Sequence, residues 1–300
     1  MFLQQIINGL TLGSVYALIA LGYTMVYGIL ELINFAHGEI YMLGAYLGII
    51  LLGFFTAIGL TSYSLTLSII LTLVLTVIFC SSYGFTIEKL AYKPLRKAPR
   101  LSPLISAIGV SIFLQNYVML TQGATDKVFP QLFGDRGIDF LSSRISLLQA
   151  AIIVAAAAVM LVLHAFVSRT RMGKAIRAVA QDKTMASLVG INIDVVISVT
   201  FIIGSGLAAI AGVMVAMYYG LVNYFIGYTA GIKAFTAAVL GGIGSIPGAM
   251  FGGILLGLIE GLGASYISSE YKDAYAFIIL VIILLLKPEG LLGKASEEKI

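Results

Sequence analysis

Residues 40–87 read IYMLGAYLGIILLGFFTAIGLTSYSLTLSIILTLVLTVIFCSSYGFTI, an uninterrupted run without a charged side chain. A helix needs roughly 20 predominantly apolar residues to cross the hydrocarbon core of a bilayer. The run is therefore too long for one membrane span, and the polar stretch TSYS at 61–64 predicts a turn between helices near 40–60 and 64–86. Continuous apolar runs favour helices because a helix satisfies its own backbone hydrogen bonds in lipid.

The rest of the chain repeats this pattern. Hydrophobic residues make up 60% of the 300 residues and charged residues only 11%, whereas a soluble domain has about 25% charged residues. This composition excludes a soluble enzyme, a disordered protein and a nucleic-acid-binding protein. The sequence predicts an all-α polytopic membrane protein, a single transmembrane domain over residues 1–300, with eight or nine transmembrane helices. The further apolar stretches lie at 6–30, 101–123, 145–167, 195–232 and 274–286.

Basic residues are concentrated in two loops. Loop 88–100 carries five Lys or Arg side chains against one acidic residue, and loop 168–194 carries five against two. Because cytoplasmic loops carry an excess of Lys and Arg, we expect both loops in the cytoplasm. The loop 124–144 between them is balanced in charge and is expected outside, which places the N-terminus outside. The C-terminal tail, with three lysines against three glutamates, is uninformative alone, and we favour the cytoplasm for it.

Residues 241–257 read GGIGSIPGAMFGGILLG, which is too glycine-rich for one uninterrupted helix, since each glycine costs about 1 kcal/mol relative to alanine. Broken helices at membrane depth are tolerated only where protein or a water-filled cavity covers the freed backbone. We therefore expect a re-entrant half-helix, a tight turn at 244–247 and a second helix, so that residues 230–268 cross once or twice. The residues assigned to this broken-helix turn are Gly242, Gly244, Pro247 and Gly248.

The glycines of this segment match those of an earlier one. Each pair is displaced by 204 residues: Gly38 and Gly242, Gly44 and Gly248, Gly48 and Gly252, Gly53 and Gly257. Paired glycine-interrupted segments in two halves of a chain are typical of transporters built from repeats, with the substrate path at the repeat interface. The spacing predicts a two-fold internal repeat. The alternative is chance, because 33 glycines supply many alignments.

Polar residues inside apolar stretches are functional candidates, because a charge near the bilayer centre costs about 2.5–3.5 kcal/mol on insertion scales. Asn34, His37 and Glu39 lie between the first two apolar stretches. They form either a polar hinge or gate in the permeation path, or an interfacial turn in which Asn34 caps the second helix. Gln115 and Asn116 lie in the middle of a span and either line the path or hydrogen-bond to neighbouring helices.

Lys233 and Glu260 flank the glycine-rich break and could pair, but the sequence does not show whether they are in contact. The two histidines and the single cysteine provide no metal cluster at ligand spacing, and no phosphate-binding loop is present. We therefore expect no enzymatic activity, metal or cofactor in this chain. If transport uses ATP, the ATPase is another chain.

Residues 168–192, SRTRMGKAIRAVAQDKTMASLVGIN, differ in kind from the spans. The pattern predicts an amphipathic helix over 174–188, with Gly190 as its stop. One interpretation is a helix that lies on anionic lipid. The other is a helix that docks into a cleft of a cytoplasmic motor.

Several motifs resemble permease subunits of branched-chain amino-acid ABC importers of the LivH type. The opening of that family is matched by LTLGSVYAL at 10–18, ALG at 20–22, NFAHG at 34–38 and GAY at 44–46. The family's cytoplasmic coupling segment, late glycine motif and C-terminal ending are matched by GKAIRAVAQD at 173–182, GGIGSIPGA at 241–249 and PEGLLG at 288–293. The similarity runs essentially from end to end.

The resemblance implies one of two permease subunits in the cytoplasmic (inner) membrane of a bacterium or archaeon. Its partners would be a homologous second permease, two cytoplasmic ATP-binding subunits and an extracytoplasmic amino-acid-binding protein. Leu, Ile and Val would enter by alternating access, driven by ATP hydrolysis in the partners. The expected path residues are Asn34, His37, Gln115 and Asn116. The residues expected to couple to the ATPases are Gly173, Lys174, Arg177, Ala178, Asp182, Ala186 and Gly190.

Two alternatives remain open at this stage. One is a permease of a related importer for another small solute, such as urea, a short amide or a sugar. The other is a secondary transporter or channel that works alone. The sequence does not distinguish the first alternative from a branched-chain amino-acid permease. The second predicts uptake without partner subunits.

Overall fold

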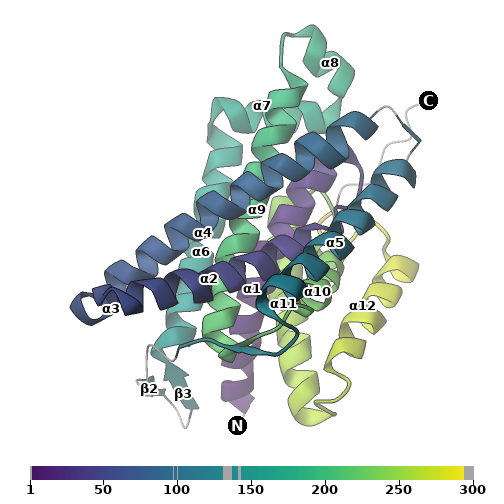
Figure 1. Ribbon diagram of the computed structural model, residues 1–300. Coiled ribbons are helices and arrows are strands. Elements are labelled where there is room, and N and C mark those ends of the chain that lie inside the picture. Colours follow the sequence, from purple (N-terminus) through teal and green to yellow (C-terminus); the bar gives the residue numbers. More distant parts are fainter. Residues whose placement is uncertain (1, 97, 100, 131–136, 141–142, 294–300) are drawn as a thin grey trace.

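The computed structural model describes residues 2–96, 98–99, 101–130, 137–140 and 143–293, so parts of the predicted loops and of the C-terminal tail lie outside the described residues. It is a bundle of long helices with two small strand pairs (Figure 1). The helices are α1 (Phe2–Leu30), α2 (His37–Ala57), α3 (Leu60–Tyr63), α4 (Leu65–Ile87), α5 (Leu101–Gln122), α6 (Leu147–Arg169), α7 (Arg171–Gln181), α8 (Lys183–Leu188), α9 (Ile193–Tyr219), α10 (Ile226–Gly241), α11 (Ile246–Tyr266) and α12 (Lys272–Leu286). A π-helical turn, η1 (Glu88–Tyr92), and a 3-10 turn, η2 (Lys93–Leu95), continue α4.

Seven helices of the described part are long and apolar enough to cross a membrane. They are α1, α2, α4 with its continuation to Leu95, α5, α6, α9 and α11. This confirms an all-α polytopic membrane protein. The prediction of eight or nine crossings remains untested, because α10 and α12, with 16 and 15 residues, fall below the usual length of a span.

The strands join loops at the end of the bundle that holds the N-terminus, whereas α7 and α8 lie at the opposite end (Figure 1). β1 (Lys127–Val128) pairs antiparallel with β4 (Leu221–Val222), and β2 (Gly137–Phe140) pairs with β3 (Ser143–Ser146). The loops after α5 and α9 therefore share one side of the bundle, and the segment 168–192 lies on the other. This arrangement agrees with the relative placement that the charge pattern predicts.

The apolar run 40–87 forms two long helices, as predicted, but the break between them is wider than the expected turn at 61–64. Gly59, with φ of 78°, follows the end of α2, and α3 forms a single helical turn. Ser64 then begins α4, because its hydroxyl accepts a hydrogen bond from the backbone N–H of Leu67 at 3.3 Å.

The glycine-rich segment also forms two helices, α10 and α11, separated by residues 242–245. The turn begins two residues earlier than predicted. Gly242 and Gly244 have φ angles of 106° and 90°, which glycine adopts without a steric penalty. The hydroxyl of Ser245 accepts from the N–H of Gly248 at 3.2 Å, and Pro247 occupies the first turn of α11, where a missing N–H has no cost.

The glycines that suggested a repeat have different surroundings in the two halves. Gly44 packs α2 on Ala209 of α9, whereas its counterpart Gly248 packs α11 on Gly241 of α10. Gly53 has open space around it, with no atom within 4 Å of the point where a Cβ would lie, whereas its counterpart Gly257 lies against α1. The two-fold repeat stays a prediction.

The segment 168–192 contains two helices, so the prediction of a single helix over 174–188 is wrong. Thr170 begins α7, since its hydroxyl accepts from the N–H of Gly173 at 3.0 Å. Asp182 interrupts the helix with extended backbone, and its carboxylate accepts from the N–H of Met185 at 3.0 Å to cap α8. Gly190, with φ of 84°, follows the end of α8 and is the stop that the sequence predicts.

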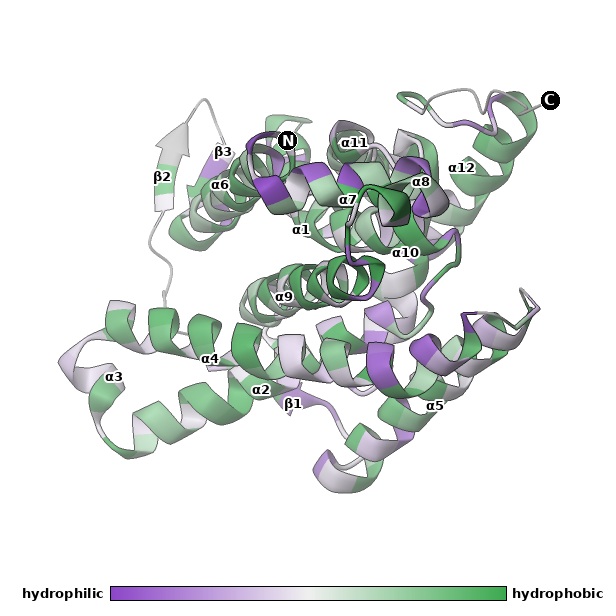
Figure 2. Cartoon of the chain, turned by 90° about the horizontal axis from the view of Figure 1, so that it is seen from above, coloured by the Kyte–Doolittle hydropathy of each residue, from purple (hydrophilic) through white to green (hydrophobic). Residues whose placement is uncertain are grey.

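α1 lies at the centre of the bundle and packs closely on α11. In the most apolar stretches of α1 and α9, 78% and 72% of the residues are buried, against 22% in α4 and α5. Figure 2 shows α9 between the α1–α11 pair and the α2–α4 pair. A Cβ at Gly257 would clash with the backbone of Gly13, and one at Gly253 would clash with Ala17. Small residues allow this close approach, on which helix association in lipid depends.

We predict that Gly257→Val separates α1 from α11 and destabilises the folded chain. Overpacking a close contact costs about 1–3 kcal/mol, and here the clash is with backbone that cannot rotate away. Thermal unfolding of the purified protein in detergent measures the effect. The control is Gly53→Val, which also lies within a helix but has open space around it. Equal unfolding midpoints for the two variants would contradict the close α1–α11 contact.

Candidate permeation junction and coupling cavity

The first turns of α2 and α10 meet inside the bundle. A Cβ at Gly38 would clash with the backbone carbonyl of Gly227 at the start of α10. His37 packs against Gly22 in α1, and its ring lies edge-on to Tyr23, with the ring centroids 4.8 Å apart. Two helices therefore begin beside the interior of α1 rather than at an end of the bundle. Discontinuous helices that begin within the membrane are typical of transporter substrate paths.

Glu39 connects three helices at this junction. Its side chain is 1% exposed, and Oε1 accepts a hydrogen bond from the hydroxyl of Ser111 in α5 at 3.0 Å. Oε2 lies against Gly227 and has no hydrogen-bond partner among the described residues. The positive ends of the α2 and α10 dipoles stabilise a carboxylate at this position. Glu39 therefore links the start of α2 to α5 and α10.

Asn34 is buried in the turn before α2. Its Oδ1 accepts from the hydroxyl of Tyr92 at 2.8 Å, which ties the turn to η1. The N-cap of α2 is Ala36, and no side chain caps the helix. Only the backbone carbonyl of Asn34 accepts from the N–H of His37, at 3.0 Å. The alternative in which the Asn34 side chain caps the second helix is wrong, because that side chain bonds to Tyr92 instead.

The two predicted path residues in α5 have different surroundings. Gln115 lies one turn from Ser111, on the side of α5 that faces Glu39, and its Nε2 is buried without a partner among the described residues. Asn116 is exposed, and its side chain donates to the carbonyl of Ile112 in its own helix at 2.8 Å. The structure therefore places Asn34, His37 and Gln115 around one junction and leaves Asn116 outside it.

An ion cluster around the buried Lys233 and Glu260 joins four helices. The Lys233 ammonium in α10 lies 2.7 Å from Glu260 Oε1 in α11 and 2.6 Å from Asp273 Oδ1 in α12. The hydroxyl of Tyr16 in α1 donates to Glu260 Oε2 at 2.9 Å. The sequence marks Lys233 and Glu260 as unusual, but their contact depends on how α10 and α11 fold back on each other at 242–245.

We predict that Lys233→Met strongly destabilises the chain, because it leaves Glu260 as a buried charge without a cation. Removing one partner of a buried ion pair costs about 3–5 kcal/mol. The double variant Lys233→Met with Glu260→Gln removes both charges and should recover much of the loss. The measurement is thermal unfolding in detergent for the single and double variants.

If the double variant is as unstable as the sum of its two single variants, the ion pair does not couple α10 to α11. Asp273→Asn serves as the comparison, since Asp273 is 58% exposed and Lys233 keeps Glu260 as its partner in that variant. We expect only a small shift in its unfolding midpoint, as for exposed ion pairs in general.

A second ion network fixes the basic loop after α4 to the start of α9. Glu88 is fully buried, and it pairs with Arg96 and accepts from the hydroxyl of Ser198 in α9 at 2.9 Å. Arg96 also pairs with Asp194, and Asp194 Oδ2 lies 2.7 Å from Lys93 Nζ. Some of the basic residues that the charge count assigned to a cytoplasmic loop are therefore structural, because they neutralise Glu88 and Asp194.

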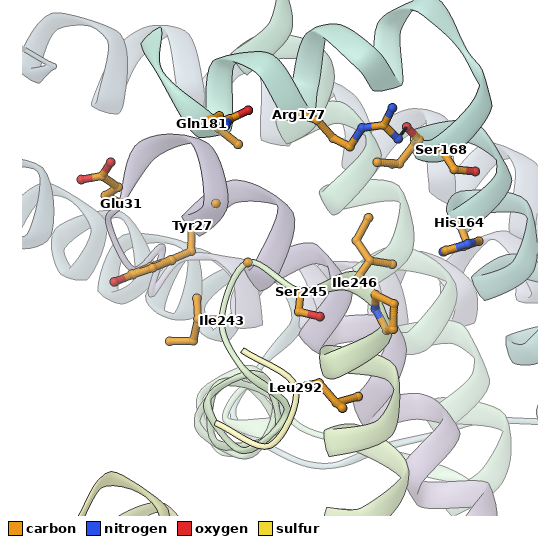
Figure 3. A pocket seen from close by; sticks show the side chains of 15 residues that line it. Tyr27, Glu31, His164, Ser168, Arg177, Gln181, Ile243, Ser245, Ile246 and Leu292 are labelled. Carbon is orange, nitrogen blue, oxygen red and sulfur yellow. Dashed lines mark hydrogen bonds between the residues drawn. The ribbon is translucent and has the colours of Figure 1, made fainter. Parts of the chain in front are cut away.

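A cavity of about 890 Å³ lies at the α7 end of the bundle (Figure 3). The ends of α1 and α6, one side of α7 and the α10–α11 turn surround it. Arg177 from the predicted coupling segment lines the same cavity as Gly244 and Pro247 from the predicted turn. The full lining is Tyr27, Gly28, Glu31, His164, Val167, Ser168, Arg177, Ala180, Gln181, Ile243, Gly244, Ser245, Ile246, Pro247 and Leu292. The cavity therefore brings together two groups of candidate residues that are about 70 positions apart in sequence.

Two of the predicted coupling residues, Gly173 and Arg177, hold α7 on the end of α6. A Cβ at Gly173 would clash with the carbonyls of Phe166 and Val167, so only glycine allows this approach. Arg177 donates from its guanidinium to the carbonyl of Val167 at 2.7 Å, which satisfies an otherwise free acceptor in the last turn of α6. Lys174 is exposed, Ala178 is half-buried and Ala186 is buried. These contacts fix α7 to the last turn of α6, and we refer to the two helices as the α6–α7 unit.

The apolar spans, the helices that begin inside the bundle and the helical segment at one end define a polytopic membrane permease. Comparison with known proteins identifies the family. The chain belongs to the family described as branched-chain amino acid transport system/permease component, which matches residues 5–284.

Curated relatives match the whole chain. The LivH permease proteins of the high-affinity branched-chain amino acid transport systems of Salmonella typhimurium and Escherichia coli K12 are 51% and 50% identical to it, over 100% of this chain and 98% of theirs. The BraD permease protein of Pseudomonas aeruginosa is 50% identical with the same coverage. These relatives are transport permease components and not enzymes. No solved structure matches the chain.

Proposed function

We propose that this chain is one of two permease subunits of an ABC importer that moves branched-chain amino acids into the cytoplasm. The observation that supports this most directly is the α6–α7 unit, whose coupling residues reach the cavity beside the broken helix. Full-length identity to LivH and BraD permeases supports Leu, Ile and Val as substrates. The partners are a homologous permease, two cytoplasmic ATP-binding subunits and an extracytoplasmic binding protein.

The orientation follows from the charges. The N-terminus and the strand pairs face the outside, whereas α7, α8 and the C-terminal tail face the cytoplasm. The membrane is the cytoplasmic (inner) membrane of a bacterium or archaeon. The ATP-binding subunits contact the exposed side of α7 and α8, which includes Lys174, and the binding protein delivers substrate at the opposite end.

Motion passes from the ATP-binding subunits to the path in four steps. The subunits displace α7 and α8 when they bind ATP. α6 follows, because Arg177 and the close contact at Gly173 fix α7 to its last turn. The cavity leaves room for the α10–α11 turn to shift, since Gly244 and Pro247 line it. α10 then transmits the shift to its first turn at Gly227.

The junction of α2 and α10 is the gate of this alternating-access mechanism. Asn34, His37 and Gln115 surround it, and the proposed path runs past them. Asn116, on the exposed side of α5, contributes where the second permease completes the path. Because such a path needs no tight site in this chain, the binding protein supplies most of the specificity.

We predict that Arg177→Asp and Gly173→Asp uncouple ATP hydrolysis from transport. The assay is uptake of leucine into vesicles that contain the chain assembled with its partner permease, ATP-binding subunits and binding protein. Wild-type uptake requires ATP, and isoleucine and valine compete with leucine. Each variant should reduce uptake about 5- to 150-fold, which is the range of effects that typical coupling free energies produce. ATP hydrolysis and membrane insertion should persist.

Lys287→Asp is the control, because it reverses an exposed basic charge outside α7, α8 and the cavity lining and should leave uptake unchanged. Unchanged uptake in both coupling variants would contradict the role of α7. Leucine uptake without the ATP-binding subunits would contradict the importer itself and favour a transporter that works alone. Competition by urea or a sugar instead of isoleucine would contradict the substrate class.

A further inference from the structure

One wall of the coupling cavity has a positive character. Figure 3 shows Arg177 and the first residues of α11 on one side, and Glu31 on the opposite side. α11 begins at Ile246, and its N-terminal turn presents the positive end of the helix dipole to the cavity. Arg177 uses one donor on Val167 and has five in all, so most of its donors remain for a ligand. This side of the cavity suits an anion.

An apolar stripe of α6 leads directly into this cavity. Val154, Ala158, Leu161, Ala165 and Ser168 are spaced four and three residues apart, so they share one face of the helix. Val154 and Leu161 are 68% and 66% exposed, and Ser168 lines the cavity. An exposed apolar stripe of a membrane helix that ends beside a cationic group matches a lipid with its chains along the helix and its head group at the end.

The first turns of α11 form a second apolar wall. Pro247 lines the cavity, and Phe251, one turn further along, is 49% exposed. Both α6 and α11 pack on α1, which forms the floor between them. The cavity is therefore lined by Arg177 and the start of α11, and exposed apolar side chains of α6 and α11 continue from it.

The surrounding charge favours the same ligand. Arg169, Arg171 and Lys174 are exposed on the segment that carries Arg177. Basic pockets between helices on the cytoplasmic side are typical binding sites for anionic lipid head groups. Glu31 is the acidic residue among those that line the cavity, and it lies on the side away from Arg177.

We propose that this cavity binds the phosphate head group of an anionic phospholipid of the cytoplasmic leaflet, with an acyl chain along the Val154–Leu161 face of α6. The Arg177 guanidinium donates to the phosphate, and the positive end of the α11 dipole lies beside it. The cavity volume of about 890 Å³ accommodates a glycerophosphate head group with part of its chains. The head group occupies only the Arg177 side of the cavity, and its binding does not depend on which solute is transported.

The test measures lipid that stays bound to the chain purified in mild detergent with the subunits that accompany it. The purified protein is first stripped of lipid, and phosphatidylglycerol is then titrated into it. Native mass spectrometry quantifies the phosphatidylglycerol that stays bound. Arg177→Gln should weaken retention about tenfold, as expected for the loss of one charge-assisted contact, whereas Arg177→Lys should retain much of it. The matched control is Arg171→Gln, which removes the same charge from an exposed residue outside the cavity lining.

Equal retention in Arg177→Gln and Arg171→Gln would show general attraction to anionic membranes and would overturn the site. Inorganic phosphate or sn-glycerol 3-phosphate at millimolar concentration should not displace the lipid, because neither has an acyl chain for the α6 face. Displacement by either would overturn the lipid in favour of a soluble phosphate ligand. Leu161→Asp provides an independent variant at the chain end of the site and should also weaken retention.

These outcomes are separate from those of the transport assay. If Arg177→Gln impairs leucine uptake but retains phosphatidylglycerol, the lipid site is wrong and the coupling role stands. If uptake needs no ATP-binding subunits but the lipid dissociates from Arg177→Gln, the proposed importer is wrong and the lipid site stands.

Discussion

The close contact between α1 and α11 is the constraint on which the other parts of the structure depend. Glycine at 13 and 257 brings the two backbones together, and α11 in turn fixes the 242–245 turn at one end and Glu260 at the other. Lipid provides no hydrophobic driving force between helices, so such small-residue contacts have to supply the association. With α1 and α11 fixed, α10 can only fold back along them. This places its first turn against the start of α2.

Two helices that begin inside a membrane protein leave polar backbone groups that lipid cannot satisfy. This chain covers them with its own interior. The starts of α2 and α10 face each other at Gly38 and Gly227, with the Glu39 carboxylate beside both. Such a junction is held by few directional bonds, since Glu39 Oε2 and His37 Nε2 have no partners among the described residues. Because few hydrogen bonds hold the α2–α10 junction together, its conformation can change with a small input of free energy. The α6–α7 unit, by contrast, is fixed by Gly173 and Arg177 and is suited to transmit force.

The sequence predicted the features that depend on local pattern. Apolar length located α1, α2, α4, α5, α6 and α9, and glycine content located the 242–245 turn to within two residues. The contact between Lys233 and Glu260 could not be predicted, because it depends on how two helices cross after that turn. The roles of Asn34 and Asp182 were missed for a related reason. Asn34 has a tertiary partner, Tyr92, that outweighs capping, and Asp182 splits an amphipathic pattern that reads equally well as one helix.

The proposed mechanism requires that the coupling segment moves relative to the α10–α11 turn during ATP-driven import. The distance between spin labels on cysteines introduced at Ala180 in α7 and Ile243 in the turn, which line the same cavity, measures this motion. Cys80 is buried and should remain unlabelled. In the assembled importer, we predict that trapping the ATP-bound state shifts this distance by several ångströms and that nucleotide release restores it. An unchanged distance in a complex that still imports leucine would contradict the mechanism.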